Sequence, residues 1–458
     1  MRICALFSRG LAVALFLSLI PVGAFSAQKI TAGGTCKLAK QQVTYGEKIY
    51  TCTKSGNKLL WNKGVAVKKP TPTPTLSFPV SGSDLLLAAD DCRLSDSSGN
   101  NFHLGFPMTP IIKDLSRIRI FAIPFEFTDS KNYRISKDQT SKMFESVASY
   151  YLQESQGKTK LDFIFPSVQG SLEQIDTLSL GVKAEESPLT KQFRSLDFTL
   201  YINQLLSKTP KSWNLDSYDA VVLYSQDSRT FNFLGGQGWR GTEKSTIGQL
   251  PFDSPSGKIR SLVFASAIST VMAHELGHSL FGFIDLYDLS GQGQGQSFAQ
   301  GWGLMAAAFS GEMNIRGWEK WLAGWLSPEE IRCTKSETTH FLDFIPSQSG
   351  SPKLLIYPLD NQRAVVVEAI DTDLIAMENK VPLVVFCNKS SSCQKYNRKG
   401  LLAYTVDVTK LSALGVIVVP EALKFPKILI DNTFVSISEV IVRNLGCNTK
   451  GCFVSIGR

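Results

Sequence analysis

Histidine is scarce in this chain, with only 4 among 458 residues, so two histidines at metal-ligand spacing carry information. Long apolar runs are absent too. After residue 27 no stretch approaches the roughly 18 apolar residues of a membrane span, which excludes a membrane-spanning helix there. The chain has no collagen-like repeat, and its 43 % hydrophobic content excludes a disordered composition. It can therefore bury a substantial core, divided over two or three domains.

Most of the chain has no net positive charge, although the net charge of the whole is +8. Residues 28–70 hold nine lysines and one acidic residue, Glu47, whereas the residues after 70 sum to −2. This distribution argues against nucleic-acid binding by the main body. It predicts that the N-terminal module is attracted to an anionic surface such as a cell wall. A lysine-rich face that only keeps the module soluble is an equal alternative.

The first 27 residues have the pattern of a cleavable secretory signal. Arg2 and Arg9 precede the apolar run LAVALFLSLIPVGAF, and small residues lie at its end and just beyond it, at Ala24, Ser26 and Ala27. An uncleaved membrane anchor is the alternative, but the run is short for a span. We therefore expect a secreted protein, associated with the cell wall if the lysine-rich module binds there.

Eight cysteines remain once a signal containing Cys4 is removed, an even number that suits disulfides in an oxidising compartment. The even count favours a structural bridge over a role for Cys92 as an inhibitory metal ligand. Eight cysteines allow 105 connectivities, so the pairing stays a prediction. Short loops favour three pairs and leave the other two cysteines to each other: Cys36 with Cys52, Cys387 with Cys393, Cys447 with Cys452, and Cys92 with Cys333.

Composition changes divide the chain into five segments. The alternating prolines of KKPTPTPTLSFP cannot form a sheet ladder and favour an extended spacer. Short alternating apolar runs after about residue 335, such as AVVVEAI and GLLAYTVDV, indicate a separate β-rich domain. The predicted segments are a signal peptide at 1–27, a small basic cysteine-paired module at 28–69, a Pro/Thr linker at 70–82, a central domain at 83–335 and a β-rich domain at 336–458.

Strand and helix patterns alternate in the central domain. RIRIFAIPFEF at 117–127 and DAVVLYS from Asp219 are rich in branched and aromatic residues, which predicts buried strands. An amphipathic helix is predicted from about Ser136, and Gly157 ends it. Residues 265–281, ASAISTVMAHELGHSLF, are small or apolar nearly all round and predict a buried helix.

The sequence HELGH lies on this last helix. His274 and His278 are four residues apart, so both imidazoles project from one helix face and can hold a single Zn²⁺ ion. Glu275 lies beside them, where its carboxylate can act as general base toward a metal-activated water. The alternative, a helix with two core histidines, would bury two imidazoles and a carboxylate that all need partners.

A third metal ligand is expected after the helix. Many single-domain zinc peptidases place it six residues beyond the second histidine, but that position is the apolar Ile284. Gly282 marks the helix end, and counting from it predicts Asp285 as the ligand, with the extra residue absorbed by a π-bulge in the last helical turn. Further residues stay open as alternatives: Tyr287 and Asp288 just beyond, or Glu312 and Glu319, of which Glu319 is also placed to cap its own helix.

Six motifs resemble a known family: HELGHSLFGFIDLYD, GWGLMAAAFSG, WEKWLAGWL, IPFEFTD, SYYLQESQGK and GLLAYTVD. They are similar to successive motifs of the immune inhibitor A family of secreted bacterial zinc metallopeptidases, over about residues 117–408. The resemblance implies a zincin/metzincin-like catalytic domain with a twisted mixed sheet and an active-site helix. It also implies zinc bound by His274, His278 and Asp285, Glu275 as general base, and a methionine turn at Met305.

The sequence departs from the family pattern at two places. One residue is inserted between His278 and Gly282, which bears on the identity of the third ligand. The stretch GWGLM lacks the aspartate that usually precedes the Leu-Met pair, which bears on the support of the turn.

We expect from the sequence a secreted zinc-dependent endopeptidase of α+β fold that hydrolyses protein or peptide substrates through a metal-activated water. The alternative is a catalytically degenerate, metallopeptidase-like binding protein at the cell surface. Zn²⁺ is the expected cofactor. A structural Ca²⁺ has no support from a motif, because the chain has no EF-hand loop and no nonapeptide repeat.

Overall fold

The structure is a computed structural model that forms two compact units, Met1–Thr75 and Leu76–Arg458. Some expected features lie outside the described residues: the signal at 1–27, most of the linker, the Cys387–Cys393 pair, and the candidate ligands Tyr287, Asp288 and Glu312. The described residues are 30–45, 48–66, 79–96, 102–107, 112–168, 171–187, 189, 198–232, 236–241, 254–286, 303–306, 314–345, 347, 350–371, 399–410, 416–419 and 428–458.

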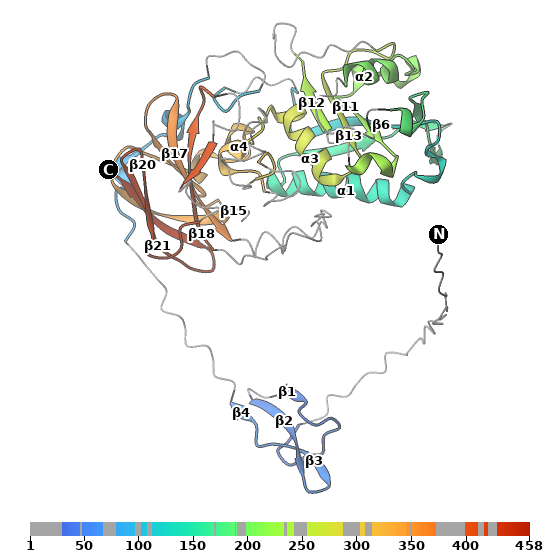
Figure 1. Ribbon diagram of the computed structural model, residues 1–458. Coiled ribbons are helices and arrows are strands. Elements are labelled where there is room, and N and C mark those ends of the chain that lie inside the picture. The colour runs from blue at the N-terminus through green and yellow to red at the C-terminus, as the bar shows by residue number, and fades with distance from the viewer. Residues whose placement is uncertain are drawn as a thin grey trace, which may run out of the picture. The chain divides into compact units, whose positions relative to one another are not determined.

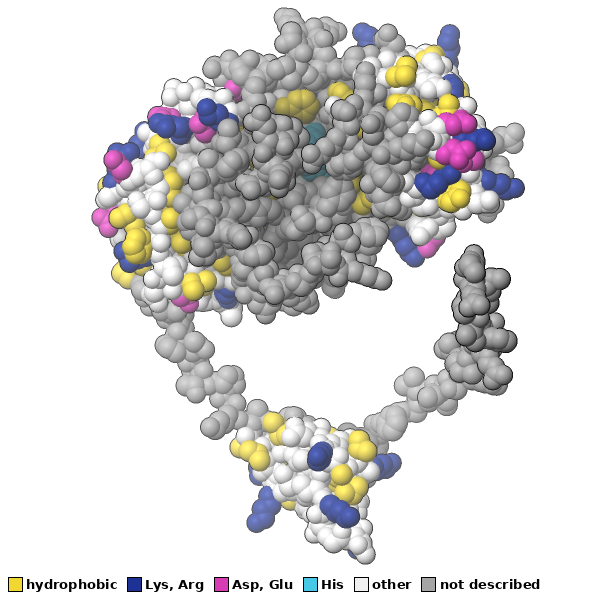
Figure 2. Space-filling view, viewed as in Figure 1, with side chains coloured by type: hydrophobic (Ala, Val, Ile, Leu, Met, Phe, Trp, Pro, Cys, Tyr) yellow, Lys and Arg dark blue, Asp and Glu magenta, His cyan; other side chains and the backbone are white. Residues whose placement is uncertain are grey.

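The smaller unit is built on a four-stranded antiparallel sheet in which β2 pairs with β1, β3 and β4. The Cys36–Cys52 disulfide ties the loop before β1 to β2, as predicted. All of its described lysines are exposed, and none of its described residues is acidic (Figure 2). The strands are β1 (Gln42–Tyr45), β2 (Lys48–Ser55), β3 (Lys58–Trp61) and β4 (Val65–Ala66).

The larger unit contains a six-stranded mixed sheet. On one side of β6 lies β11, which in turn pairs with β13, and these three strands are parallel. On the other side of β6, both β7 and β10 pair with it in parallel. β12 runs antiparallel to β13 and is the last strand on its side. The strands are β6 (Arg117–Glu126), β7 (Lys160–Ile164), β10 (Leu178–Ser179), β11 (Ala220–Ser225), β12 (Gly236–Arg240) and β13 (Ser261–Ser266), beside a hairpin of β8 (Ser167–Val168) and β9 (Ser171–Ile175).

Helices cover both faces of this sheet (Figure 1). Successive residues of β6 and β11 point to opposite faces, and both sets belong to buried apolar clusters, as in strands enclosed on two sides. α1 and α3 pack on one face and α2 on the other. Ser136 caps α1 by accepting the N–H of Gln139. The helices are α1 (Lys137–Glu154), α2 (Thr199–Leu206), α3 (Ser269–Leu276), the π-helix η9 (Gly277–Phe281) and α4 (Gly317–Leu322).

A second sheet of ten strands follows the order β20-β21-β22-β15-β17-β16-β14-β5, with β18 beside β17 and β19 beside β18. Most of its strands come from the C-terminal third of the chain, as the alternating apolar runs predicted. The strands are β5 (Leu86–Leu87), β14 (Ile331–Thr334), β15 (Thr338–Ile345), β16 (Leu354–Pro358), β17 (Arg363–Asp371), β18 (Lys399–Asp407), β19 (Val416–Val419), β20 (Phe434–Ile437), β21 (Val440–Cys447) and β22 (Gly451–Gly457).

The two regions expected as separate domains, 83–335 and 336–458, share one hydrophobic core. Tyr151 of α1 and Trp325 after α4 belong to the same buried cluster as Val366 of β17 and Tyr404 of β18. The opposite face of β17 packs into a second core inside the ten-stranded sheet. One face of this sheet therefore packs against the helical half of the molecule.

Two further disulfides are those predicted from the sequence. Cys92 and Cys333 join the segment before β6 to β14, and Cys447 and Cys452 join β21 to β22. The fold is mixed α and β, as expected. Within the described part of the chain, no helix is both long and apolar enough to cross a membrane.

The buried helix predicted at 265–281 begins later than expected. Ser261–Ser266 forms β13, which is buried along its whole length between β11 and β12, and α3 starts at Ser269. A short run that is apolar all round has no periodicity to separate an enclosed strand from a buried helix. The predicted helix start was therefore wrong, whereas HELGH does lie at the end of the helix.

Candidate metal centre

The end of the buried helix carries both histidines of the motif. His274 belongs to α3, and the π-helix η9 continues the helix and carries His278. Gly282 ends it in the left-handed region, with φ 73°, a conformation that favours glycine. The predicted π-bulge is confirmed, and it accommodates the extra residue before Gly282.

Asp285 lies beside both histidines. Its Oδ1 is 3.0 Å from His274 Nε2 and 3.2 Å from His278 Nε2, and the two Nε2 atoms are 3.1 Å apart. Tetrahedral zinc with ligands at about 2.0–2.1 Å places its ligand atoms about 3.3 Å from one another. The three side chains that the sequence proposed as ligands are therefore spaced as one ion requires, and they form a potential metal-binding group among the described residues.

Backbone carbonyls select the tautomer of each ring. His274 Nδ1 lies 2.9 Å from the carbonyl oxygen of Leu304, and His278 Nδ1 contacts the carbonyl oxygen of Phe283. A carbonyl oxygen only accepts, so each Nδ1 donates, and each ring, when it is neutral, presents the lone pair of its Nε2 to the cluster. In that form two lone pairs and a carboxylate oxygen converge on one point, which suits a cation.

The same contacts shift the pKa values of the cluster. Burial opposes a charge on His278, but attraction and hydrogen bonding to Asp285 outweigh it and raise the pKa of His278 to about 9. Burial also opposes the charge on Asp285, yet the two histidines hold the pKa of that carboxyl well below its usual range. Asp285 is therefore anionic at neutral pH and favours a cation between the three side chains.

Glu275 faces the antiparallel edge strand β12. It is 6 % exposed, and burial raises the pKa of its carboxyl, which His274 and His278 partly offset. A Cβ on Gly236 would lie 2.4 Å from Glu275 Cγ, and one on Gly238 would lie 2.4 Å from the carbonyl oxygen of Glu275. The backbone of Gly238 also hydrogen-bonds to the carboxylate. A side chain at either glycine would displace Glu275.

The sequence analysis assigned no role to Gly236 and Gly238. They belong to the glycine-rich stretch FLGGQGWRG, in which they alternate along the strand β12. Glycines inside a strand often mark the close approach of another backbone or side chain. That spacing is the signal by which the two residues could have been found.

A turn at 303–306 supports the cluster. Its Leu304 carbonyl is the acceptor for His274 Nδ1, and its Met305 carbonyl accepts the N–H of Leu286 at 2.9 Å. Met305, where the sequence analysis placed a methionine turn, is fully buried. The turn therefore orients one histidine ring and the backbone that follows Asp285, the candidate carboxylate ligand.

Glu319, an alternative third ligand, does not join the cluster. Its Oε2 accepts the N–H of Arg316 at 3.3 Å and caps α4, and burial raises the pKa of its carboxyl to about 7. The other two histidines also lie elsewhere. His103 is paired with Asp96 at 3.5 Å, and His340 belongs to β15.

The cluster is slightly exposed to solvent. The side chains of His278 and Asp285 are 12 % and 17 % exposed. Some histidine surface is visible on the larger unit in Figure 2. Phe102 packs edge-on against His278, with ring centroids 6.1 Å apart. The candidate metal-binding atoms are therefore largely, but not completely, shielded from solvent.

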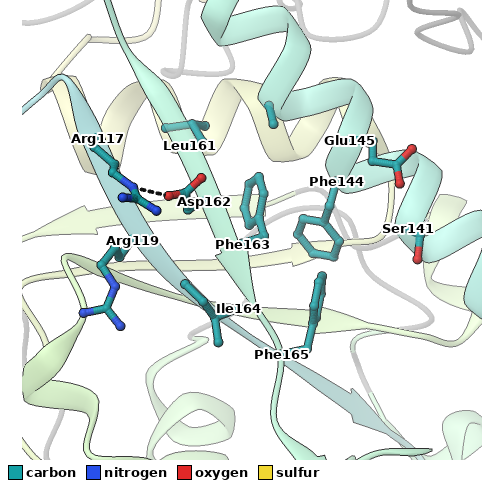
Figure 3. Close-up of a pocket in the computed structure, with 11 residues that line it drawn as sticks. Arg117, Arg119, Ser141, Phe144, Glu145, Leu161, Asp162, Phe163, Ile164 and Phe165 are labelled. Carbon is teal, nitrogen blue, oxygen red and sulfur yellow. Dashed lines mark hydrogen bonds and ion pairs between the residues drawn. The ribbon is translucent and has the colours of Figure 1, made fainter. Parts of the chain in front are cut away.

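A pocket of about 500 Å³ lies apart from the cluster, beside β7. Phe144, Phe163 and Phe165 line it, and Arg117 pairs with Asp162 at its rim (Figure 3). β7 lies on the side of β6 away from β11, β13 and β12, so the pocket is at the opposite edge of the sheet from Glu275. The residues that line this pocket include none of the candidate metal-site residues, which lie beside β12.

Comparison with known proteins gives no independent assignment. The sequence matches no protein-family model and no curated protein. The geometry of His274, His278, Asp285 and Glu275 therefore carries the argument about function.

Proposed function

We propose that this protein is a zinc-dependent endopeptidase with a metzincin-like catalytic domain, akin to the immune inhibitor A family. The main support is the convergence of two imidazole nitrogens and one carboxylate oxygen, 3.0 to 3.2 Å apart, beside a buried glutamate. Three nitrogen or carboxylate ligands are typical of catalytic zinc, which keeps its fourth position for water or substrate.

In this proposal His274, His278 and Asp285 hold the ion, which supplies Lewis-acid polarisation of the scissile carbonyl and of a water molecule. Glu275 is the general base that takes a proton from the water and returns it to the leaving amine. Burial raises the pKa of Glu275, which brings the carboxyl closer to the pH at which it must both accept and release a proton. Gly236 leaves the space that the Glu275 side chain occupies.

The edge strand β12 offers a place for an extended peptide. Among the described strands it is the last in its sheet order, and its residues Gly236 and Gly238 pack directly against Glu275. An exposed sheet edge binds an extended chain through backbone hydrogen bonds, which every peptide can make. This geometry favours cleavage within a chain and so supports an endopeptidase.

Metal content and proteolysis of the purified protein test this proposal. We expect stoichiometric zinc and cleavage of casein by the wild type. Glu275→Ala is expected to abolish cleavage at unchanged zinc content, because Glu275 is a base and not a ligand. Glu145→Ala is the control, since Glu145 is an exposed glutamate on α1. A zinc-loaded wild type as inert as Glu275→Ala on a broad peptide library would refute peptidase activity.

We propose in addition that the protein is secreted and that its smaller unit attaches it to an anionic cell-wall surface. The exposed lysines of that unit and its lack of described acidic residues support this. The alternative function, a catalytically degenerate binding protein, uses the same surface. A chain beginning at residue 79 is expected to keep zinc and lose sedimentation with isolated cell walls at low salt. Unchanged sedimentation would argue against attachment through the smaller unit.

A further inference from the structure

The start of α4 is held between two buried carboxylates. Glu368 of β17 accepts the Arg316 guanidinium through Oε1 at 3.1 Å and the Gly317 N–H through Oε2 at 2.8 Å. From the other side, Glu154 at the end of α1 accepts the Ile315 N–H at 2.8 Å. Both carboxylates are 1 % exposed. Charges so deeply buried act on the backbone around them, because they cannot exchange their partners for water.

This segment in turn supports the turn beneath the metal cluster. The Asn314 carbonyl accepts the Leu304 N–H at 3.1 Å. Gly303, with φ +109°, packs so closely that a Cβ on it would lie 3.2 Å from Arg316 Nε. The Leu304 carbonyl then accepts His274 Nδ1 at 2.9 Å. A continuous series of contacts thus leads from β17 of the second sheet to a candidate metal ligand.

We propose that Glu368 is a positioning residue for the metal centre, and that the ten-stranded sheet is a working part of the catalytic unit. The inference rests on the proposed function. Glu368 touches none of the candidate ligands and acts through Arg316 and Gly317. By fixing the start of α4 it fixes the turn at 303–306, which orients the ring of His274.

The expected loss of zinc affinity can be judged from residues at other metal sites that orient a ligand without binding the metal. Loss of a group that orients a metal ligand typically costs 10- to 100-fold in metal affinity. Glu368→Gln keeps an acceptor for the Gly317 N–H but removes the charge that faces Arg316. We therefore expect zinc affinity to fall roughly tenfold in this variant, at the lower end of that range.

Glu330 offers a matched control in the same part of the fold. It is 3 % exposed, its Oε2 accepts the Ser327 N–H at 2.9 Å, and its Oε1 pairs with the buried Lys353. Like Glu368, it combines a helix cap with a buried ion pair. The described residues that hydrogen-bond to Glu330 or form an ion pair with it, however, lie within 327–353 and not in the turn at 303–306.

The experiment compares the full chain as wild type, Glu368→Gln and Glu330→Gln. Zinc affinity is measured by competition with a chelator, and Tm is measured in metal-free protein. We expect both variants to lose thermal stability, but only Glu368→Gln to lose zinc affinity. Equal zinc affinity in the two variants would show that Glu368 is merely structural and would overturn the inference. If the wild type binds no zinc, the proposed function fails and the inference with it.

Tyr404→Phe tests the same support by a milder change, in case Glu368→Gln does not fold. The Tyr404 hydroxyl of β18 accepts the Trp318 N–H at 3.3 Å, one residue further into α4. Weaker zinc binding by a folded Tyr404→Phe protein supports the inference, and affinity equal to that of the wild type counts against it.

Discussion

His274 and His278 present their Nε2 atoms to each other at 3.1 Å, while each Nδ1 donates to a backbone carbonyl. The two donated hydrogen bonds leave both lone pairs facing the carboxylate of Asp285. In their neutral forms the two rings and the carboxylate therefore offer electron pairs to one position. The arrangement is compatible with one metal ion bound by both rings and by Asp285.

Asp285 is expected to dominate zinc retention. Its Oδ1 lies within 3.2 Å of the Nε2 atoms of both histidines, so Asp285→Ala removes a proposed ligand. The loss of a residue that only orients a ligand typically weakens metal binding roughly 10- to 100-fold, and we expect Asp285→Ala to weaken zinc binding more than that. Asp288→Ala, at a position outside the described residues, should weaken it less. Zinc retained after dialysis against a chelator measures both. Equal losses would contradict the assignment of Asp285.

Gly236→Ala is expected to impair catalysis while leaving the metal in place. The new Cβ would collide with Glu275 and move the base, and general-base catalysis typically contributes 10²- to 10⁴-fold. We expect kcat on a peptide substrate to fall about 100-fold at unchanged zinc content. Gly350→Ala is the control, because a Cβ there meets no atom within 4 Å. A Gly236→Ala enzyme with wild-type kcat would show that Glu275 tolerates displacement.

His340 is expected to make the protein less stable in mild acid. Burial, and to a smaller degree Arg332, lower the pKa of His340 from 6.5 to about 4. Between these two pH values the unfolded chain binds a proton that the folded protein does not, so the free energy of unfolding falls as the pH drops from 6.5 toward 4.

His340→Leu removes this titration, so its stability relative to the wild type should rise as the pH falls through that range. Thermal unfolding of both metal-free proteins from pH 7.5 to 4 measures the difference. A constant difference in stability across the range would mean that His340 keeps an ordinary pKa in the fold.

The Cys92–Cys333 bridge is expected to stabilise the fold more than the Cys447–Cys452 bridge. Their sequence separations are 241 and 5 residues. Chain-entropy arguments then assign them about 5 and about 2 kcal/mol of unfolding free energy. Replacing each pair by two serines and measuring denaturant unfolding tests this order. A reversed order would show that the loop entropy of the unfolded chain is not the main contribution.

The spacing of residues along the chain allowed much of the candidate site to be predicted from the sequence alone. The helix repeat places His274 and His278 on one face, and Gly282 is a residue that readily ends a helix, so Asp285 could be counted from it. Three disulfides were predicted from loop length and elimination, and Ser136 was recognised at the start of α1. Each of these relations depends on residues close in the chain or on a short list of partners.

Packing between distant segments decided what the sequence could not. Residues 265 and 266, expected at the start of the buried helix, instead end the strand β13, which β11 and β12 enclose. Gly236 meets Glu275, and Glu368 meets Arg316, only because separate segments are brought together. Periodicity and spacing report on neighbours along the chain, and they hold no information about which distant side chains will touch. The packing of Gly236 against Glu275 and the support of the candidate centre by the second sheet therefore emerge only in the folded molecule.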